Sequence, residues 1–410
     1  MTGKGAMRDT LASMKSTPVG VFDLVLRGGR LFDPGTGLDA AGDLAFRNGR
    51  IAAIGTRLDV EGARKVVDVR GGIVVPGLVD LHTHVYWGAT GLGVDAESLC
   101  CRSGTTTFVD AGSAGAGNFA GFRRFVAEPT KLKILAFLNV SYAGIFGFGP
   151  GLWVGENWDL RLIDRDACAR VVEANRDLIV GIKVRIGAEA GGPSGLAPLE
   201  MALEVAERLR VPIMAHVDMP PPSLSEVLAR LRPGDVWTHC FRGPPNAAVS
   251  AAGELERDVL AARKRGVLFD VGHGFGSFSF ETARRMFAEG IYPDSISSDV
   301  HTFSVDGPAR DLLHVASKFL CLGVPLADIV RRVSSAPARC ICRPELGRLA
   351  VGGTGDAVVL SEEGGQFEFV DSLGEVLTGE RRLRADFVVV DGAVWERPLP
   401  ASDRPEARPR

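Results

Sequence analysis

Histidines and an aspartate stand at the ends of apolar, strand-like runs in this sequence. His82 and His84 lie in VDLHTH, His216 in IMAHV, His239 in VWTHC, and Asp299 ends SISSD. Imidazole and carboxylate groups are ligands of zinc and related divalent metals, and a catalytic metal keeps one position for water. A His-x-His pair alone could be a hydrogen-bonded polar pair, and a lone strand histidine is more often a core residue. The recurrence of the pattern at several strand ends favours a metal site.

Lys183 is unusual among the charged residues, because it lies in the apolar segment GIKVRIG. A lysine between isoleucine and valine in a buried strand carries a large desolvation cost unless it is neutralised or paired. A salt bridge to an interior carboxylate such as Asp110 or Asp270 would remove this cost. Chemical modification of the amine would also remove it, and the sequence leaves both alternatives open.

The elements that must position these residues are eight short apolar runs that alternate with amphipathic, helix-length segments. Apolar residues at three-to-four spacing predict helices at 197–210, 253–266 and 279–290. Eight strand–helix units predict an α/β fold of the (β/α)8 TIM-barrel type, whose active site lies at the carboxyl ends of the strands. The runs occupy 73–82, 105–112, 133–140, 179–187, 211–217, 236–243, 267–274 and 295–301.

Short alternating segments broken by GG or NG flank this region on both sides, as is typical of β-hairpins. They predict a small β-sandwich domain that is built from both chain termini, residues 21–75 and 345–398. The metal-binding barrel domain then spans 76–344. Residues 1–20 and 399–410 have no periodic apolar pattern and are predicted to be flexible tails.

Composition restricts the partners of the chain. The 410 residues carry a formal net charge of -3 and contain no run of lysine or arginine, which argues against nucleic acid or a membrane surface and favours a small-molecule substrate. No apolar stretch of about 18 residues and no signal-peptide core occur, so a cytoplasmic protein is expected. Seven scattered cysteines are expected to be reduced thiols. The sequence is compatible with a homo-oligomer.

Several of these features together resemble the amidohydrolase superfamily of metal-dependent hydrolases. They are PGLVDLHTH after a β-rich start, a lysine in the fourth run, histidines in the fifth and sixth, an aspartate in the eighth, and the closing PELGRLAVGGTGDAVVL. The resemblance spans about residues 20–398 and implies two divalent metal ions, with zinc expected, bridged by a carbon dioxide-derived carbamate on Lys183. It implies His82, His84 and Asp299 as ligands of one ion and His216 and His239 as ligands of the other.

The resemblance also implies a mechanism and a substrate class. A metal-activated water attacks a carbonyl, and Asp299 acts first as general base and then as general acid; a helix N-cap is the alternative role for Asp299. Dihydroorotases typically carry an arginine where this chain has Tyr86, and the superfamily's single-metal deaminases need a glutamate that HVDMPPP lacks.

Two further segments, VGHGFGSFSFETA and SSDVHTFSVDGP, resemble deacetylase-like amidohydrolases that are often labelled dihydroorotases. This resemblance implies deacetylation of an N- or O-acylated carboxylic acid. The alternatives are ring opening of a cyclic amide or lactone, as in a dihydroorotase, and a non-catalytic scaffold on the same barrel.

Strand geometry predicts residues that contact the substrate. Because alternate residues of a strand face the same way, Arg185 is expected to face inward like Lys183, nearer the barrel mouth. Its guanidinium could grip a substrate carboxylate through two hydrogen bonds or pair with a loop carboxylate such as Asp218. The other predicted contacts, from strand spacing or from loops, are Tyr86, Tyr142, His273 and Ser277.

Overall fold

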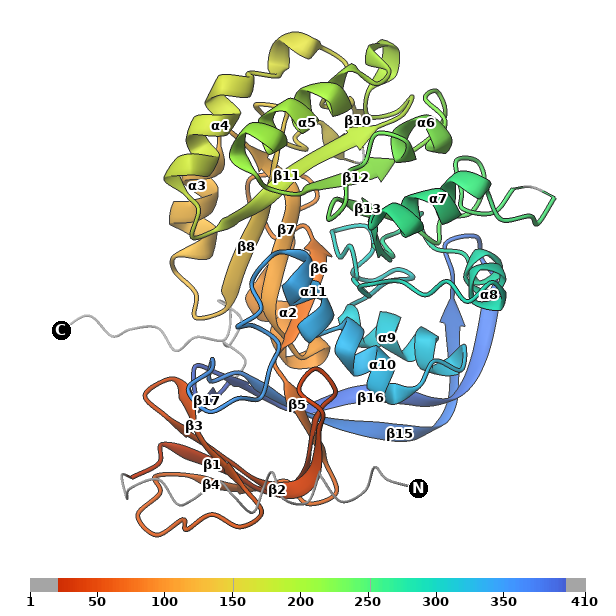
Figure 1. Cartoon of the computed structure of the whole chain (residues 1–410). Coiled ribbons are helices and arrows are strands. Elements are labelled where there is room, and N and C mark those ends of the chain that lie inside the picture. The colour runs from red at the N-terminus through yellow and green to blue at the C-terminus, as the bar shows by residue number, and fades with distance from the viewer. Residues whose placement is uncertain (1–20, 150, 251, 396–410) are drawn as a thin grey trace.

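Two β-sheets organise the computed structural model, which describes residues 21–149, 151–250 and 252–395 (Figure 1). The predicted tails, 1–20 and 399–410, lie outside the described residues. One sheet forms a barrel and the other forms a small β domain. Within the described part of the chain, no helix is both long enough and apolar enough to cross a membrane.

The barrel sheet consists of seven parallel strands within the described residues, in the order β14-β13-β12-β11-β8-β7-β6. The predicted eighth strand makes only single bridges to the two edges, from Ser295 to Asp270 and from Val300 to Thr83. This segment departs from a regular ladder because Asp299 has a left-handed backbone conformation. The TIM-type barrel is confirmed, with an irregular closing strand. The strands are β6 (Leu78–Thr83), β7 (Thr105–Gly115), β8 (Lys133–Asn139), β11 (Ile179–Ile186), β12 (Ile213–Val217), β13 (Val236–Thr238) and β14 (Leu268–Asp270).

Helices follow the barrel strands and bury their apolar faces against them. Polar side chains fix several helix starts: the Asp95, Asp164 and Ser279 side chains each accept a hydrogen bond from a backbone N–H of the first turn. The predicted helices form as α5, α7 and α8. The helices are α2 (Ala96–Ser103), α3 (Phe119–Phe122), α4 (Arg165–Ala174), α5 (Ala197–Leu209), α6 (Leu224–Leu228), α7 (Arg257–Arg265), α8 (Phe280–Ala288), α9 (Leu312–Cys321), α10 (Leu326–Arg332) and α11 (Ser335–Cys340).

Strands from both ends of the described chain form the small β domain, as predicted. Its sheet has the order β17-β16-β15-β5-β1-β2-β3, with β4 on β1, and β15 joins the two ends of the chain by pairing antiparallel with β5. Leu26, Phe46, Val74 and Val359 lie in its separate apolar core. The strands are β1 (Leu24–Asp33), β2 (Leu38–Arg47), β3 (Arg50–Gly55), β4 (Val66–Asp68), β5 (Ile73–Pro76), β15 (Ala357–Val370), β16 (Val376–Val390) and β17 (Ala393–Val394).

The long hairpin of β15 and β16 leaves the small sheet and runs along the barrel past α9 to α8 (Figure 1). Its tip holds the loop after β14, because Asp371 accepts a hydrogen bond from the Phe280 backbone N–H and Ser372 donates one to the Phe278 carbonyl. Buried Lys318 on α9 donates to the carbonyls of Pro308 and Val370. The hairpin therefore fixes loops that surround the barrel mouth.

Candidate metal centre

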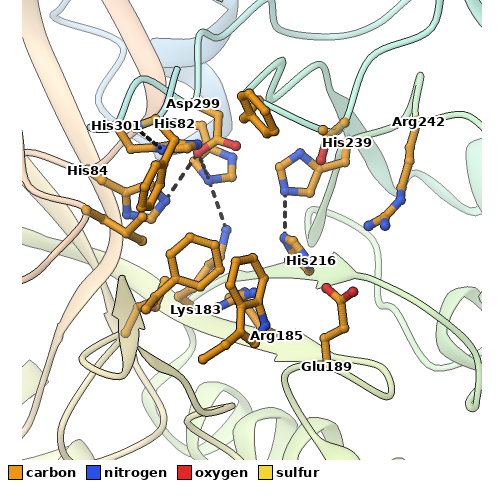
Figure 2. A pocket seen from close by; sticks show the side chains of 18 of the residues that line it. His82, His84, Lys183, Arg185, Glu189, His216, His239, Arg242, Asp299 and His301 are labelled. Atoms are coloured by element: carbon orange, nitrogen blue, oxygen red, sulfur yellow. Dashed lines mark hydrogen bonds and ion pairs between the residues drawn. The ribbon is translucent and has the colours of Figure 1, made fainter. Parts of the chain in front are cut away.

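A cavity of about 400 Å³ opens at the carboxyl ends of the barrel strands. All six metal ligands predicted from the sequence line it, although they come from five different strands or strand-like segments. Figure 2 shows these side chains directed toward one another. The polar lining consists of His82, His84, Lys183, Arg185, Glu189, His216, His239, Arg242, Ser277, Asp299 and His301, and the apolar lining includes Leu92, Ile145, Phe148, Trp153, Phe275 and Phe303.

The first cluster joins the end of β6 to the closing segment. Asp299 Oδ1 lies 3.3 Å from His82 Nε2 and 3.2 Å from His84 Nε2. These residues form a group whose ligand atoms could hold one metal ion. The buried Oδ1 atom has no hydrogen-bond partner in the described structure.

The second cluster lies on the neighbouring strands β12 and β13. His216 Nδ1 and His239 Nε2 are 2.7 Å apart (Figure 2). The other ring nitrogen of His239, Nδ1, lies 2.6 Å from the Gly272 carbonyl oxygen and must donate to it. His239 Nε2 therefore carries a lone pair that faces His216.

A hydrogen-bond chain behind His82 fixes which of its nitrogens faces the cavity. Thr238 donates its hydroxyl hydrogen to Asp270 at 2.8 Å, so it accepts from His82 Nδ1, also at 2.8 Å. His82 Nε2 is then unprotonated and faces Asp299. A lone-pair nitrogen of His82 and a carboxylate oxygen of Asp299 face each other, with His84 Nε2 beside them, and a cation among them would remove their repulsion, so this donor set fits a divalent metal.

Unusual backbone conformations place two of these side chains. Asp299 has φ of 48° and His239 has φ of 66°, in the left-handed region that side chains larger than glycine rarely adopt. Gly274 also has positive φ, and a Cβ there would lie 2.2 Å from Asp299 Oδ2. The alternative role of Asp299 as a helix N-cap is wrong, because the next helix, α9, is capped by Asp311.

Burial sets the charge of the clustered groups. It lowers the pKa of His82, His216 and His239 well below the usual value, and that of His84 to about 3. The imidazoles are therefore neutral, the form that binds metals. Burial also raises the pKa of Asp299 to about 6, against the opposing effects of His301 and Lys183.

Lys183 is fully enclosed at the bottom of the cavity. Its Nζ lies 3.2 Å from His82 Nε2, and burial lowers the pKa of the amine to about 7. In the described structure it forms no ion pair. Asp110 accepts backbone hydrogen bonds from Val85 and Ser113, and Asp270 accepts hydroxyl hydrogen bonds. The salt-bridge alternative for Lys183 is therefore not observed.

The predicted substrate contacts divide into those at the cavity and those away from it. Arg185 and Ser277 line the cavity, and Arg185 Nη1 donates to Glu156 at 3.2 Å rather than to Asp218. Tyr86, Tyr142 and His273 are not among the described lining residues. The Tyr86 hydroxyl donates to the Asn118 carbonyl, and Tyr142 is half-exposed. His273 is buried and accepts a hydrogen bond from Lys318.

Sequence reasoning missed several residues of the cavity. Arg242 follows His239 by three residues, and Phe148 and Trp153 lie on the β9 (Phe148–Gly149) and β10 (Leu152–Trp153) hairpin after β8. A search for charged residues just beyond each strand end could have found Arg242. The aromatic residues lie in a long loop, where no periodic pattern marks which side chains turn inward.

Comparisons with known proteins show clear similarities. The chain is 36% identical over 324 residues to a deacetylase of Brucella anthropi, covering 79% of this chain and 80% of that protein. A solved adenine deaminase structure has a TM-score of 0.85 at 27% identity and covers 91% of this chain and 99% of its own. A solved dihydroorotase structure has a TM-score of 0.83 at 34% identity, with 90% and 98% covered. No protein-family model matches the chain.

Proposed function

The chain belongs to the amidohydrolase superfamily of metal-dependent hydrolases, and from this premise we propose that it is a deacetylase of N- or O-acylated carboxylic acids. The observation that carries the proposal is the convergence of the His82 and His84 Nε2 atoms on Asp299 Oδ1 inside a cavity. The similarity to a protein named deacetylase supports the removal of an acetyl group as the reaction.

Two divalent ions, with zinc expected, fit the two clusters of ligands. His82, His84 and Asp299 would hold one ion, and His216 and His239 would hold the other. When bound, such ions lower the pKa of water and polarise the carbonyl that is attacked. The protein contributes ligand positions at the strand ends and a cavity of about 400 Å³ in which the substrate could bind.

Asp299 is the proposed proton carrier. Its Oδ2 is the carboxylate oxygen close to Gly274, while its Oδ1 faces His82 and His84. Asp299 takes the proton of the attacking water and returns it to the amine or alcohol that leaves, so a general base becomes a general acid. Glycine at position 274 gives its carboxylate the space to do this.

Lys183 is the proposed bridge between the two ions. Its neutral amine adds to the carbon of carbon dioxide, a new N–C bond forms, and one proton leaves to give a carbamate anion. An anion suits this position, because neutral imidazoles surround the amine and no carboxylate in the described structure pairs with it. The modification would replace an amine by an anionic group that could serve as a ligand between the two clusters.

Ring opening of a cyclic amide is the second candidate function. The similarity to a structure named dihydroorotase favours it, and the same ligands would serve either reaction. Tyr86 stands where an arginine would hold the substrate carboxylate in a dihydroorotase, and its hydroxyl is directed to Asn118. Linear acylated acids therefore fit this chain better.

A substrate panel tests the proposed function. Protein loaded with zinc in the presence of bicarbonate is given N-acetylated amino acids, O-acetylated hydroxy acids, dihydroorotate and hydantoins. The proposal expects acetate release and little ring opening. Ring opening as the dominant reaction would support the second candidate, and no turnover of either class would reject both.

A further inference from the structure

Two arginines line the cavity, and they differ in how their charge is balanced. Arg185 Nη1 lies 3.2 Å from Glu156 Oε2, with side chains only 9% and 3% exposed. Arg185 also lies over the Phe148 ring, 5.6 Å from its centroid. Its charge is therefore already matched by a buried carboxylate of the protein.

Arg242 has no such partner. Its Nη1 donates to the Val217 carbonyl at 3.3 Å, and no carboxylate oxygen lies within 4 Å among the residues that the structure describes. A guanidinium offers five N–H donors, so most of the donors of Arg242 have no protein partner among the described residues and can bind a ligand. Burial lowers the pKa of Arg242, which marks the cost of a cation held out of water.

The nearby acids do not offset this charge at contact distance. Asp218 accepts hydrogen bonds from the backbone of Glu189 and Ala190, which occupy both of its oxygens. Glu189 is exposed, and water screens its attraction for Arg242. Arg242 thus remains a partly buried, weakly bonded cation at the wall of the cavity.

The position of Arg242 relates it to the second histidine cluster. It lies three residues after His239, and it lines the same cavity as His216 and His239. Figure 2 shows its guanidinium on the side of the cavity that holds His216 and Glu189. A substrate whose acyl group lies among the metal ligands could direct a carboxylate to this guanidinium.

We propose that Arg242, and not Arg185, binds the carboxylate of the substrate. This inference rests on the proposed deacetylation of an acylated acid and names the residue that recognises the acid. A carboxylate completes the hydrogen bonding of Arg242 and neutralises it, whereas binding at Arg185 would compete with Glu156.

Paired substrates test this assignment. Acetate release is measured from an N-acetylated amino acid and from its methyl ester, with wild type, Arg242→Gln and Arg242→Lys. Charge-assisted hydrogen bonds predict that Arg242→Gln raises KM for the acid by about ten- to hundred-fold and changes KM for the ester little. Arg242→Lys keeps the charge but not the fork, so a smaller acid-specific rise is expected.

The matched control is the double variant Arg185→Gln/Glu156→Gln, which replaces the buried ion pair by two amides. It leaves no unpaired charge and should change KM for the acid and the ester alike. An acid-specific rise in this control, without one in Arg242→Gln, would overturn the assignment. Equal changes for acid and ester in both Arg242 variants would also overturn it, because they indicate a structural role.

A binding measurement separates this inference from the proposed function. Calorimetric titration with the free amino or hydroxy acid, and with its methyl ester, needs no turnover. If wild type binds the acid but releases no acetate from any substrate, the proposed function fails. The assignment of Arg242 can still be tested by comparing acid binding in wild type and in Arg242→Gln. Acid binding that persists in Arg242→Gln contradicts the assignment, and acid binding that is lost there supports it.

Discussion

The two sides of the cavity are built differently. On the metal side, the side chains stand on strand ends, and their orientation is fixed from behind by partners such as Thr238 for His82 and Gly272 for His239. On the substrate side, loops contribute aromatic side chains that are largely exposed, including Trp153 at 57% and Phe275 at 60%. The barrel strands therefore position the reacting groups, whereas the loops determine which substrate can bind.

Charge balance follows the same division. The imidazoles of the metal side are neutral and hydrogen-bonded, and they need only a cation to complete them. The substrate side holds one arginine matched by Glu156 and another, Arg242, whose guanidinium makes one hydrogen bond to the described residues. Each side thus indicates the charge of what it binds: cations on one side and an anion on the other.

The largest effect is expected when the metal side loses its proton carrier. Asp299→Asn should lower turnover by about 10²–10⁴-fold or more while the fold and part of the metal content persist, since an amide cannot act as the base. Steady-state kinetics, with elemental analysis and thermal unfolding of the same preparation, check this. Near-normal turnover would show that another residue is the general base. His301, which lines the cavity, is the next candidate.

The next largest effect on turnover is expected at Lys183, the proposed bridge between the two clusters. Lys183→Ala should lower turnover by at least the roughly 10–100-fold that the loss of an outer ligand partner costs. Part of the activity should return when short carboxylic acids are added, because their carboxylate can take the place of a carbamate. A variant that keeps both metal ions and most of its activity would exclude the bridge.

The space that Gly274 leaves beside Asp299 is expected to give the third-largest effect. Gly274→Ala puts a Cβ 2.2 Å from Asp299 Oδ2 at a residue with φ of 55°. A misplaced reacting group can cost about 10²-fold in turnover, so a loss approaching this size is expected. The control is Gly290→Ala, where φ is also positive, at 73°, and a Cβ meets nothing within 4 Å. Equal turnover in the two variants would show that the close approach at Gly274 has no catalytic role.

The support behind His82 is expected to have the smallest effect. Thr238→Val removes the acceptor of His82 Nδ1 and should weaken metal affinity by about 10–100-fold, as outer-shell changes do. Thr106→Val is its control, since the buried Thr106 hydroxyl has no hydrogen-bond partner in the described structure. Metal titration followed by activity measures both. Unchanged affinity in Thr238→Val would mean that barrel packing alone orients the ring.

The sequence predicted the metal side far better than the substrate side, for a physical reason. Strand alternation and the shared edge of a barrel determine where His82, His84 and Lys183 point. Their spacing in the sequence is therefore sufficient to predict that they meet in one cavity. Loop residues follow no such period. For this reason the prediction that Tyr142 and His273 lie at the mouth is wrong: they do not line the cavity in the described structure.

Partners distant in sequence were equally hidden from prediction. Arg185 was expected to face inward, and it lines the cavity, but its pairing with Glu156 depends on how the loop after β8 folds back. The apolar pattern of 295–301 predicts an ordinary strand, because a left-handed backbone at Asp299 leaves no mark in that pattern.

The most direct test of the central claim is a crystal structure of protein purified without chelator, in bicarbonate, with anomalous scattering collected at the zinc edge. We expect two metal peaks, one among His82, His84 and Asp299 and the other between His216 and His239. We also expect additional density on the Lys183 amine that contacts both. Absence of metal from either cluster, or an unmodified Lys183 beside two bound ions, would contradict the claim.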